Sequence, residues 1–306
     1  MKPVFVRLAG VALAVAAPLA SAYAADSAVI KVIGVENEYA DVVSQVGGKF
    51  VQVQAIVTDP NTDPHTFEAS PSVAKAIAAA GLIVVNGVGY DDWADKIISA
   101  TPRPHRRVIN VQKLLGLPDD TKNPHLWYDP KTMPAVAKAV GDALAELNPA
   151  EASYFHASAD KFIASLKPLT AAIENFKAKY ADTPIATTEP VSDYLLQALG
   201  LKLMTPFSLE KAIMDNTDPA PQDVTAQNDL FATTQVKAFA YNQQVTDALT
   251  KSFLDNAKKA GIPVVGVYET MPAPGYDYQS WMLAEVAALQ KAVADKVSTD
   301  TLVKGH

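Results

Sequence analysis

The chain of 306 residues contains no cysteine, and this absence removes several kinds of chemistry at once. Without cysteine there is no disulfide framework, no thiol nucleophile, no zinc ribbon and no iron–sulfur cluster. Attachment of a lipid to a cysteine after signal cleavage is excluded as well. Any metal site must therefore use histidine, aspartate, glutamate or backbone oxygen as ligands.

Basic tracts and long apolar runs are also missing. The chain has 26 Lys and Arg against 33 Asp and Glu, a net charge of −7. An acidic chain without a basic tract binds a phosphate backbone poorly, so we expect no nucleic-acid partner. With 49% apolar residues the chain is too apolar for a disordered protein. Beyond the N-terminal region no apolar run approaches the length of about 18 residues that suggests a membrane helix, which predicts a soluble mature protein.

The first 24 residues have the pattern of a cleavable secretory signal. Lys2 and Arg7 give a positive start, residues 8–17 form an apolar run, and small residues follow up to Ala24. That order is typical of a signal peptide, and the run is too short to span a bilayer. We therefore expect a signal peptide over residues 1–24 and a periplasmic protein that is not lipid-anchored.

Short β-branched runs alternate with helical patterns along the rest of the chain, which is typical of βα units and parallel sheets. The expected strands cover residues 30–35, 51–57, 82–86 and 107–111, then 184–188, 202–205, 237–241 and 263–268. The expected helices cover residues 38–46, 72–80, 134–146, 191–199, 246–260 and 278–293. Four strands in each half predict an α/β fold with two lobes, each containing a mainly parallel four-stranded sheet.

One long helix is expected to join the two lobes. Asn148 and Pro149 supply an N-cap and a favoured first residue, and one apolar stripe runs from Phe155 to Tyr180 at steps of three and four. Pro168 lies inside the stripe and is expected to kink the helix or open one turn. So stiff a connection predicts a nearly fixed separation of the lobes. The expected domains are an N-terminal lobe over 25–147, a linking helix over 148–181 and a C-terminal lobe over 182–306.

Two of the five histidines follow a proline in a loop after an expected strand: His65 follows Pro64, and His125 follows Pro124. Proline fixes its own φ and biases its predecessor toward extended geometry, so each imidazole is held by a stiffened loop. Each histidine alone is better explained as a surface residue, but two matching presentations in one lobe favour metal ligands. The other three are expected to be solvated or structural: His105, His156 and His306.

Two glutamates of the second half directly follow expected strands, Glu189 after residues 184–188 and Glu269 after residues 263–268. Ligands of open α/β sheets bind outside the carboxyl ends of the strands. Two histidines from one lobe and two carboxylates from the other are therefore expected to meet in the cleft. A place in the first turn of a helix, favoured by the helix dipole, explains Glu189 about as well.

The chain lacks the common enzyme motifs. The chain has no GxxxxGK[ST], HExxH or GxSxG motif, and Gly87-Val88-Gly89 lacks the third glycine of a dinucleotide loop. Nothing singles out a pair of carboxylates for glycoside hydrolysis. We expect no enzymatic activity. The alternative is a secreted metallohydrolase that uses the same ligands with a metal-bound water.

The two histidine loops carry a resemblance to a known family. The pattern D-P-H-x-F-E at residues 63–68, the pattern N-P-H-L-W-Y-D-P at 123–130 and the long helix resemble the periplasmic zinc/manganese-binding proteins of metal ABC importers. These are two-lobe, helix-linked substrate-binding proteins. The similarity continues through residues 87–93, 192–195 and 218–224 and covers essentially the whole mature chain. It implies a protein that captures a divalent metal ion in the cleft and delivers it to a membrane ABC permease.

The resemblance also implies a ligand set in which four loops supply one ligand each. The first two positions are His65 and His125, the third falls on Glu189, and the fourth, usually an aspartate, is nearest to Glu269. Asp277 is the alternative fourth ligand. The histidine-rich loop of many zinc-specific members is absent, and residues 118–122 stand in its place.

The choice of metal stays open between Zn²⁺ and Mn²⁺, with Fe²⁺ as a further candidate. Two imidazoles with two carboxylates favour manganese or ferrous iron in geometry, whereas zinc leads in raw affinity. The expected partners are the metal ion and the permease, and the chain is expected to act as a monomer. A surface adhesion protein is the other class considered, and the missing anchor cysteine argues against it.

Overall fold

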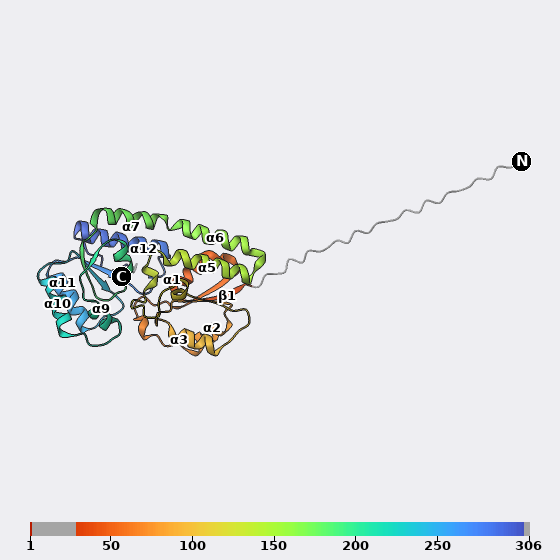
Figure 1. The fold of residues 1–306 in the computed structure, drawn as a ribbon, viewed down its shortest axis with the longest axis horizontal. Helices are drawn as coiled ribbons and strands as arrows, with labels where there is room; N and C mark the ends of the chain where they lie inside the picture. Colours follow the sequence, from red (N-terminus) through yellow and green to blue (C-terminus); the bar gives the residue numbers. More distant parts are fainter. Residues whose placement is uncertain (2–28, 303–306) are drawn as a thin grey trace.

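The computed structural model describes residues 29–302 together with Met1. Two α/β lobes lie side by side, and α6 (Ala152–Ser165) and α7 (Lys167–Tyr180) run in tandem along both of them (Figure 1). Each lobe contains a four-stranded parallel sheet, in the order β2-β1-β3-β4 in the first lobe and β6-β5-β7-β8 in the second. The predicted fold class is therefore confirmed.

The first lobe has helices on both faces of its sheet. Its strands are β1 (Ile30–Glu36), β2 (Val51–Val57), β3 (Leu82–Val85) and β4 (Arg107–Asn110). Its helices are α1 (Asn37–Gly47), α2 (Pro71–Ala79), α3 (Asp92–Ala100), α4 (Val111–Leu114) and α5 (Thr132–Leu147). Helices α1 and α5 pack on the face formed by Val32, Leu82 and Val84, whereas α2 and α3 pack on the opposite face.

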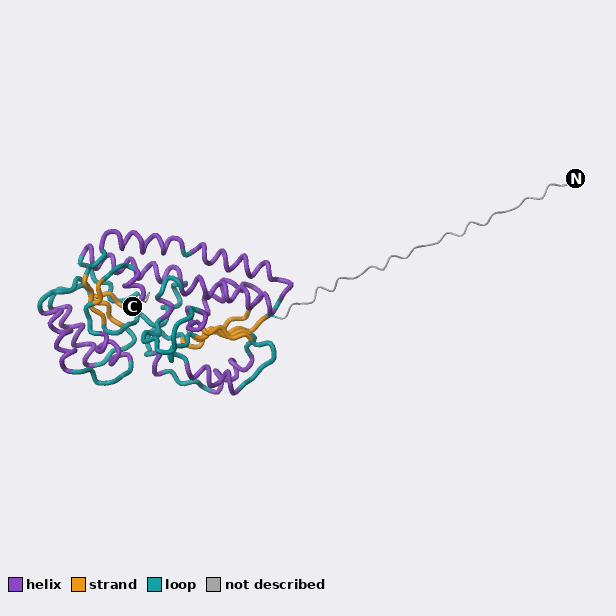
Figure 2. Tube along the Cα trace, viewed as in Figure 1, coloured by secondary structure: helices purple, strands orange, loops and turns teal. Residues whose placement is uncertain are grey.

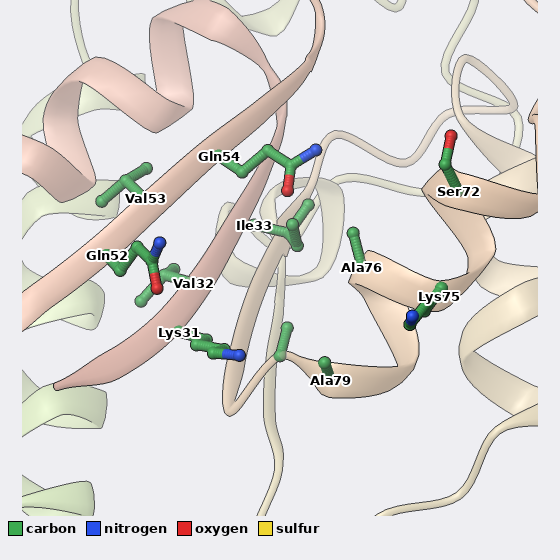
Figure 3. A pocket seen from close by; sticks show the side chains of 11 residues that line it. Lys31, Val32, Ile33, Gln52, Val53, Gln54, Ser72, Lys75, Ala76 and Ala79 are labelled. Carbon is green, nitrogen blue, oxygen red and sulfur yellow. The ribbon is translucent and has the colours of Figure 1, made fainter. Parts of the chain in front are cut away.

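Part of the face beneath α2 forms an open groove. Ile33 of β1 and the side chains of Gln52 and Gln54 on the edge strand β2 lie along the groove, with Lys31 and Lys75 at its margin (Figure 3). None of the candidate metal ligands lines this groove.

The second lobe repeats the arrangement. Its strands are β5 (Pro184–Thr187), β6 (Lys202–Leu203), β7 (Phe239–Asn242) and β8 (Val264–Val267). Its helices are α8 (Asp193–Ala198), α9 (Phe207–Met214), α10 (Pro221–Ala232), α11 (Ala248–Lys259) and α12 (Tyr278–Gln290). Helices α9, α10 and α11 cover one face, and α7, α8 and α12 contribute to the core on the other. Loops of both lobes meet between the two sheets (Figure 2).

The eight expected strands are all present, but some of their ends differ from the prediction. The strand predicted over 202–205 is only Lys202–Leu203, because the Thr205 hydroxyl, rather than a strand backbone, accepts the N–H of Thr187 at 2.8 Å. The helix predicted over 278–293 ends at Gln290 and continues as a π-helical turn, Lys291–Asp295. Helices α3, α4, α9 and α10 lie outside the helical ranges predicted from the sequence.

The linking helix is interrupted at Leu166, between α6 and α7. The N–H of Leu166 donates to the carbonyl of Ile163 at 3.2 Å, which tightens the chain at this turn. Pro168 has no N–H to donate to the carbonyl four residues earlier, so the regular ladder opens where the sequence predicts it. The apolar stripe stays continuous across the break, with Phe155, Phe162 and Phe176 all buried.

No helix within residues 29–302 is both long enough and apolar enough to cross a membrane. The expected signal peptide over 1–24 lies, apart from Met1, outside the described residues, and so does His306.

Replacing Phe155 by alanine is expected to lower the free energy of unfolding by about 3–5 kcal/mol, the usual cost of removing a buried phenyl ring. The ring is fully buried and meets Phe50 edge-on at 5.6 Å between centroids. Urea unfolding followed by circular dichroism measures the change. Lys161→Ala, at an exposed position of the same helix, should stay within about 0.5 kcal/mol of the parent protein. Equal effects of the two substitutions would contradict the role given to the stripe.

Candidate metal centre

Three ligand-type atoms converge between the lobes. The Nε2 atoms of His65 and His125 each lie 3.2 Å from Oε2 of Glu269. The ligand atoms of these three residues all lie within 4.8 Å of one another, and no other group of three or more such side chains in residues 29–302 meets this spacing. The structure therefore brings together both predicted histidines and one of the two predicted glutamates.

His65 lies in a single 3₁₀ turn, Pro64–Thr66, within the loop that follows β2. The Asp63 carboxylate accepts the backbone N–H of His65 at 2.8 Å, and Pro64 fixes the first φ of the turn. The imidazole packs edge-on against the ring of Tyr90, 5.0 Å away. Its side chain is 23% exposed, so His65 is the outermost of the three candidate ligands.

His125 is fully buried, and Asn123 fixes its orientation. Oδ1 of Asn123 accepts the backbone N–H of His125 at 2.9 Å and contacts the ring Nδ1 at 2.8 Å, while Nδ2 donates to the carbonyl of Pro190. Because these contacts orient the amide, Nδ1 of His125 is the donor in its pair. The lone pair of Nε2 then faces Glu269, as in metal-binding histidines whose other nitrogen is hydrogen-bonded.

Glu269 lies just beyond β8 and is 1% exposed. Its Oε2 accepts from the Tyr90 hydroxyl at 3.1 Å besides facing both imidazoles, and its Oε1 accepts from Nδ2 of Asn242 at 2.8 Å. The backbone N–H of Glu269 donates to Oε1 of Gln244 at 2.7 Å. Both the carboxylate and the backbone of Glu269 are thus held by neighbouring polar side chains.

The centre of the cluster favours a positive charge. The Nε2 lone pair of His125 and Oε2 of Glu269 are both acceptors, so their contact at 3.2 Å requires a proton or a cation between them. Burial lowers the pKa of His125 and outweighs the attraction of Glu269, which favours the neutral, metal-binding form. Burial alone raises the pKa of Glu269, but its close contacts with the imidazoles of His125 and His65 bring the pKa below its ordinary value.

Glu189 lies beside the three-atom cluster but is not part of it. Nδ2 of Asn242 donates to Oε2 of Glu189 at 2.9 Å and to Oε1 of Glu269 at 2.8 Å, so one amide links the two carboxylates. The other oxygen of Glu189, Oε1, is buried and has no hydrogen-bond partner among the described residues. Burial, with repulsion from Glu269, raises the pKa of Glu189 well above its ordinary value.

The remaining candidates lie away from the cluster. Asp277 is the N-cap of α12, where its Oδ1 accepts the N–H of Ser280 at 2.8 Å in a capping box. His156 forms an exposed pair with Asp142, 3.2 Å apart. His105 is exposed. Of the two alternatives for the fourth position, the cluster contains Glu269 and not Asp277.

A pocket between the lobes opens onto His65. It is lined by Tyr90 and by Asp119 and Lys122 from the first lobe, and by Lys211 and Asp215 of the second. The opening gives an ion a path from solvent to the outermost of the three candidate ligands.

Three polar residues that contact Glu269 were not identified from the sequence: Tyr90, Asn242 and Gln244. Asn242 is the last residue of β7, so the rule that ligands bind at the carboxyl ends of strands also applies to it. Gln244 follows the end of β7 by two residues and Tyr90 follows the end of β3 by five. Tyr90 lies within the quoted residues 87–93, but nothing in the sequence placed either side chain beside Glu269. Asn123 belongs to the quoted N-P-H pattern, but its contact with the ring of His125 is visible only in three dimensions.

The fold and the cluster together define a class: two-lobe, helix-linked proteins that bind a metal ion between their lobes. Residues 34–292 match the family model described as zinc-uptake complex component A, periplasmic, so the chain belongs to this family. The resemblance noted in the two histidine loops is thereby confirmed.

Two of the relatives align with this chain over only part of their own length. A protein of Thermotoga maritima is 31% identical over 172 residues, which are 55% of this chain and 61% of that protein. The manganese-binding lipoprotein MntA of Halalkalibacterium halodurans is 27% identical over 144 residues, 46% of this chain and 47% of MntA. The chain thus spans about half to three-fifths of these curated relatives.

The fold itself matches solved structures over nearly the whole of their chains. The periplasmic zinc binding protein TroA from Treponema pallidum superposes with a TM-score of 0.73 and 19% sequence identity, covering 87% of this chain and 99% of TroA. At 19% sequence identity this match shows the likeness of the fold alone.

Removing the Asn123 side chain is expected to weaken metal binding by about 10–100-fold, the usual effect of losing a partner that orients a ligand. In Asn123→Ala the ring of His125 loses the acceptor for Nδ1–H, so Nε2 is no longer fixed toward Glu269. Isothermal titration calorimetry with Mn²⁺, and competition against a chelator with Zn²⁺, measure the change. Asn256→Ala is the matched control, because it removes an asparagine hydrogen bond on α11. Unchanged affinity in Asn123→Ala would contradict the orienting role.

Proposed function

We propose that the protein captures one divalent transition-metal ion between its lobes and delivers it to an ABC permease in the membrane. The observation that carries the proposal is the convergence of His65, His125 and Glu269, whose lone pairs face one centre from both lobes. Membership of a periplasmic zinc-uptake family supports the transport role. The alternative of a secreted metallohydrolase finds no support among the relatives.

The proposed ligands are His65, His125, Glu269 and Glu189. Glu189 joins the set because its buried Oε1 lacks a partner that a cation would provide, while Asn242 keeps its other oxygen next to Glu269. A buried carboxylate oxygen without a partner is costly, and coordination removes that cost. With Glu189 bound, the metal receives two imidazole nitrogens and at least two carboxylate oxygens.

Zn²⁺ and Mn²⁺ are the proposed cargo, with Fe²⁺ as a further candidate. A donor set rich in oxygen suits Mn²⁺ and Fe²⁺, whereas the general affinity order places Zn²⁺ above both. The named relatives include a manganese-binding lipoprotein and a zinc binding protein, which is consistent with either choice. Metal supply, together with the geometry of the site, would then decide which ion is carried.

We further propose a cleavable signal peptide over 1–24 and a monomeric, periplasmic carrier without a lipid anchor. Its parts are a lobe over 25–147, a linking helix over 148–181 and a lobe over 182–306. The order of basic, apolar and small residues at the start supports the signal. The absence of cysteine supports a carrier without a lipid anchor, whereas the relative MntA is named a lipoprotein.

His65→Ala and His125→Ala test the ligand assignment. Each substitution is expected to weaken Zn²⁺ and Mn²⁺ binding by more than about 100-fold, beyond the usual effect of an outer-sphere partner. Native mass spectrometry should find one metal ion per parent chain and a clearly lower occupancy in either variant at the same metal concentration. His156→Ala, which removes an exposed histidine on α6, should bind like the parent. Full occupancy in His65→Ala and His125→Ala would refute the proposed site.

Metal affinity is expected to fall as the pH falls, because protons compete with the cation for the same atoms. Burial lowers the pKa of His65, but the hydrogen bond and charge of Glu269 outweigh burial and raise it overall. Proton competition at His65 therefore begins at a higher pH than it would for an unperturbed histidine and grows on acidification. We expect the apparent affinity for Mn²⁺ to fall by about tenfold per pH unit for each proton displaced. Calorimetry in buffers of different ionisation enthalpy counts the protons released on binding. A Mn²⁺ affinity that does not change between about pH 8 and pH 5.5 would contradict this expectation.

A further inference from the structure

One amide side chain connects the segments that carry two of the proposed ligands. Gln244 follows β7 in the second lobe and is 5% exposed. Its Oε1 accepts the backbone N–H groups of Glu269 at 2.7 Å and Thr270 at 2.9 Å. Its Nε2 donates to the carbonyl of Thr62 at 2.8 Å, with the carbonyl of Asp59 at 3.4 Å and Oγ1 of Thr270 at 3.2 Å also in reach. Both ends of the amide are therefore occupied.

The two ends of this amide reach different lobes. Thr62 belongs to the loop of residues 58–70, named here the His65 loop, and Glu269 belongs to the segment of residues 268–271, named here the Glu269 segment. The N–H groups of Glu269 and Thr270 lie beyond the end of β8, and Gln244 provides the acceptor for both. Gln244 thus links the two backbones that bring Nε2 of His65 within 3.2 Å of Oε2 of Glu269.

The other polar side-chain contacts of the His65 loop are mostly internal. Asp59 accepts from Asn61 and Thr62, and Asp63 accepts from His65 and Thr66. Within the described residues, two kinds of polar contact join this loop to the second lobe: the hydrogen bonds of Gln244 and the contact of His65 with Glu269. Without Gln244 the loop would keep its own turn but lose its hydrogen-bonded position relative to Glu269.

The Glu269 segment has a second anchor that does not involve the His65 loop. Asn37 of α1 donates Nδ2 to the carbonyl of Met271 at 2.8 Å and accepts the N–H of Met271 at 3.0 Å. Because this reciprocal pair does not involve Gln244, the segment is expected to keep one of its attachments to the first lobe when Gln244 is truncated. A change at Gln244 is therefore expected to alter ligand spacing before it alters the fold.

We infer that Gln244 is a positioning residue of the metal site, which sets the spacing between His65 and Glu269 without touching the ion. The inference rests on the proposed function. A ligand set already held at its binding geometry loses less free energy to reorganisation when the ion arrives, so a residue that fixes ligand spacing raises affinity.

The test is the metal affinity of Gln244→Ala and of Gln244→Met, which keeps much of the side-chain volume without the amide. Both variants are expected to bind Zn²⁺ and Mn²⁺ about 10–100-fold more weakly, as for other partners that orient ligands. Far-UV circular dichroism checks that each variant is folded. The matched control is Gln279→Ala, because Gln279 also joins the lobes through an amide pair with Gln45 (2.8 and 3.0 Å) but contacts no ligand segment. Its affinity should be that of the parent.

A double-mutant cycle separates positioning from a general loss of stability. Zn²⁺ is the probe, because its higher affinity keeps weakened binding measurable. If Gln244 acts by placing His65, Gln244→Ala should cost clearly less in a His65→Ala background than in the parent. Full additivity, or parent-like affinity of folded Gln244→Ala and Gln244→Met, would overturn the inference. Parent-like affinity of His65→Ala alone would instead overturn the proposed function, so the two failures are distinguishable.

Discussion

The contact of one buried carboxylate with two imidazole nitrogens is the interaction around which the region between the lobes is organised. Glu269 lies almost fully out of water, and an ionised carboxylate in that position requires a compensating charge. Within the described residues, the side-chain hydrogen bonds and ion pairs of Glu269 involve tyrosine, asparagine and histidine, and none involves lysine or arginine. The compensating charge is left to a proton on the imidazoles or to a bound cation, which is the physical basis of the proposed metal site.

Neutral amides surround this contact and hold its side chains and backbone in place without adding net charge. Asn123 orients His125, Asn242 separates the carboxylates of Glu189 and Glu269, and Gln244 holds the backbone of Glu269. An amide offers a donor and an acceptor without adding net charge, so it fixes a ligand without competing with the ion. A lysine at the place of Asn242 would neutralise both carboxylates and remove the attraction for a cation.

The sequence predicted the features that depend on local chemistry. Prolines before His65 and His125 marked the loops of the two converging histidines, the ends of strands marked Glu269, and Pro168 marked the break near Leu166. The sequence placed Glu189 at a strand end but could not predict that it lies beside the three-atom cluster, because an amide of β7 lies between the two carboxylates. Asp277 could have been set aside, since Asp277 and Ser280 have the spacing of a capping box, a local signal for a helix start.

The long tandem helix gains its role from the core that it covers. The largest apolar cluster is continuous between the lobes and includes Trp127 of the first lobe, Phe176 of α7 and Tyr268 of the second. Trp127 packs edge-on against His125 at 5.4 Å, and Tyr268 directly precedes Glu269, so ligands from both lobes are backed by the same packed core. Close-packed interiors resist small displacements. The spacing between His125 and Glu269 is therefore set by side-chain packing, which supports the expectation of a nearly fixed separation between the lobes.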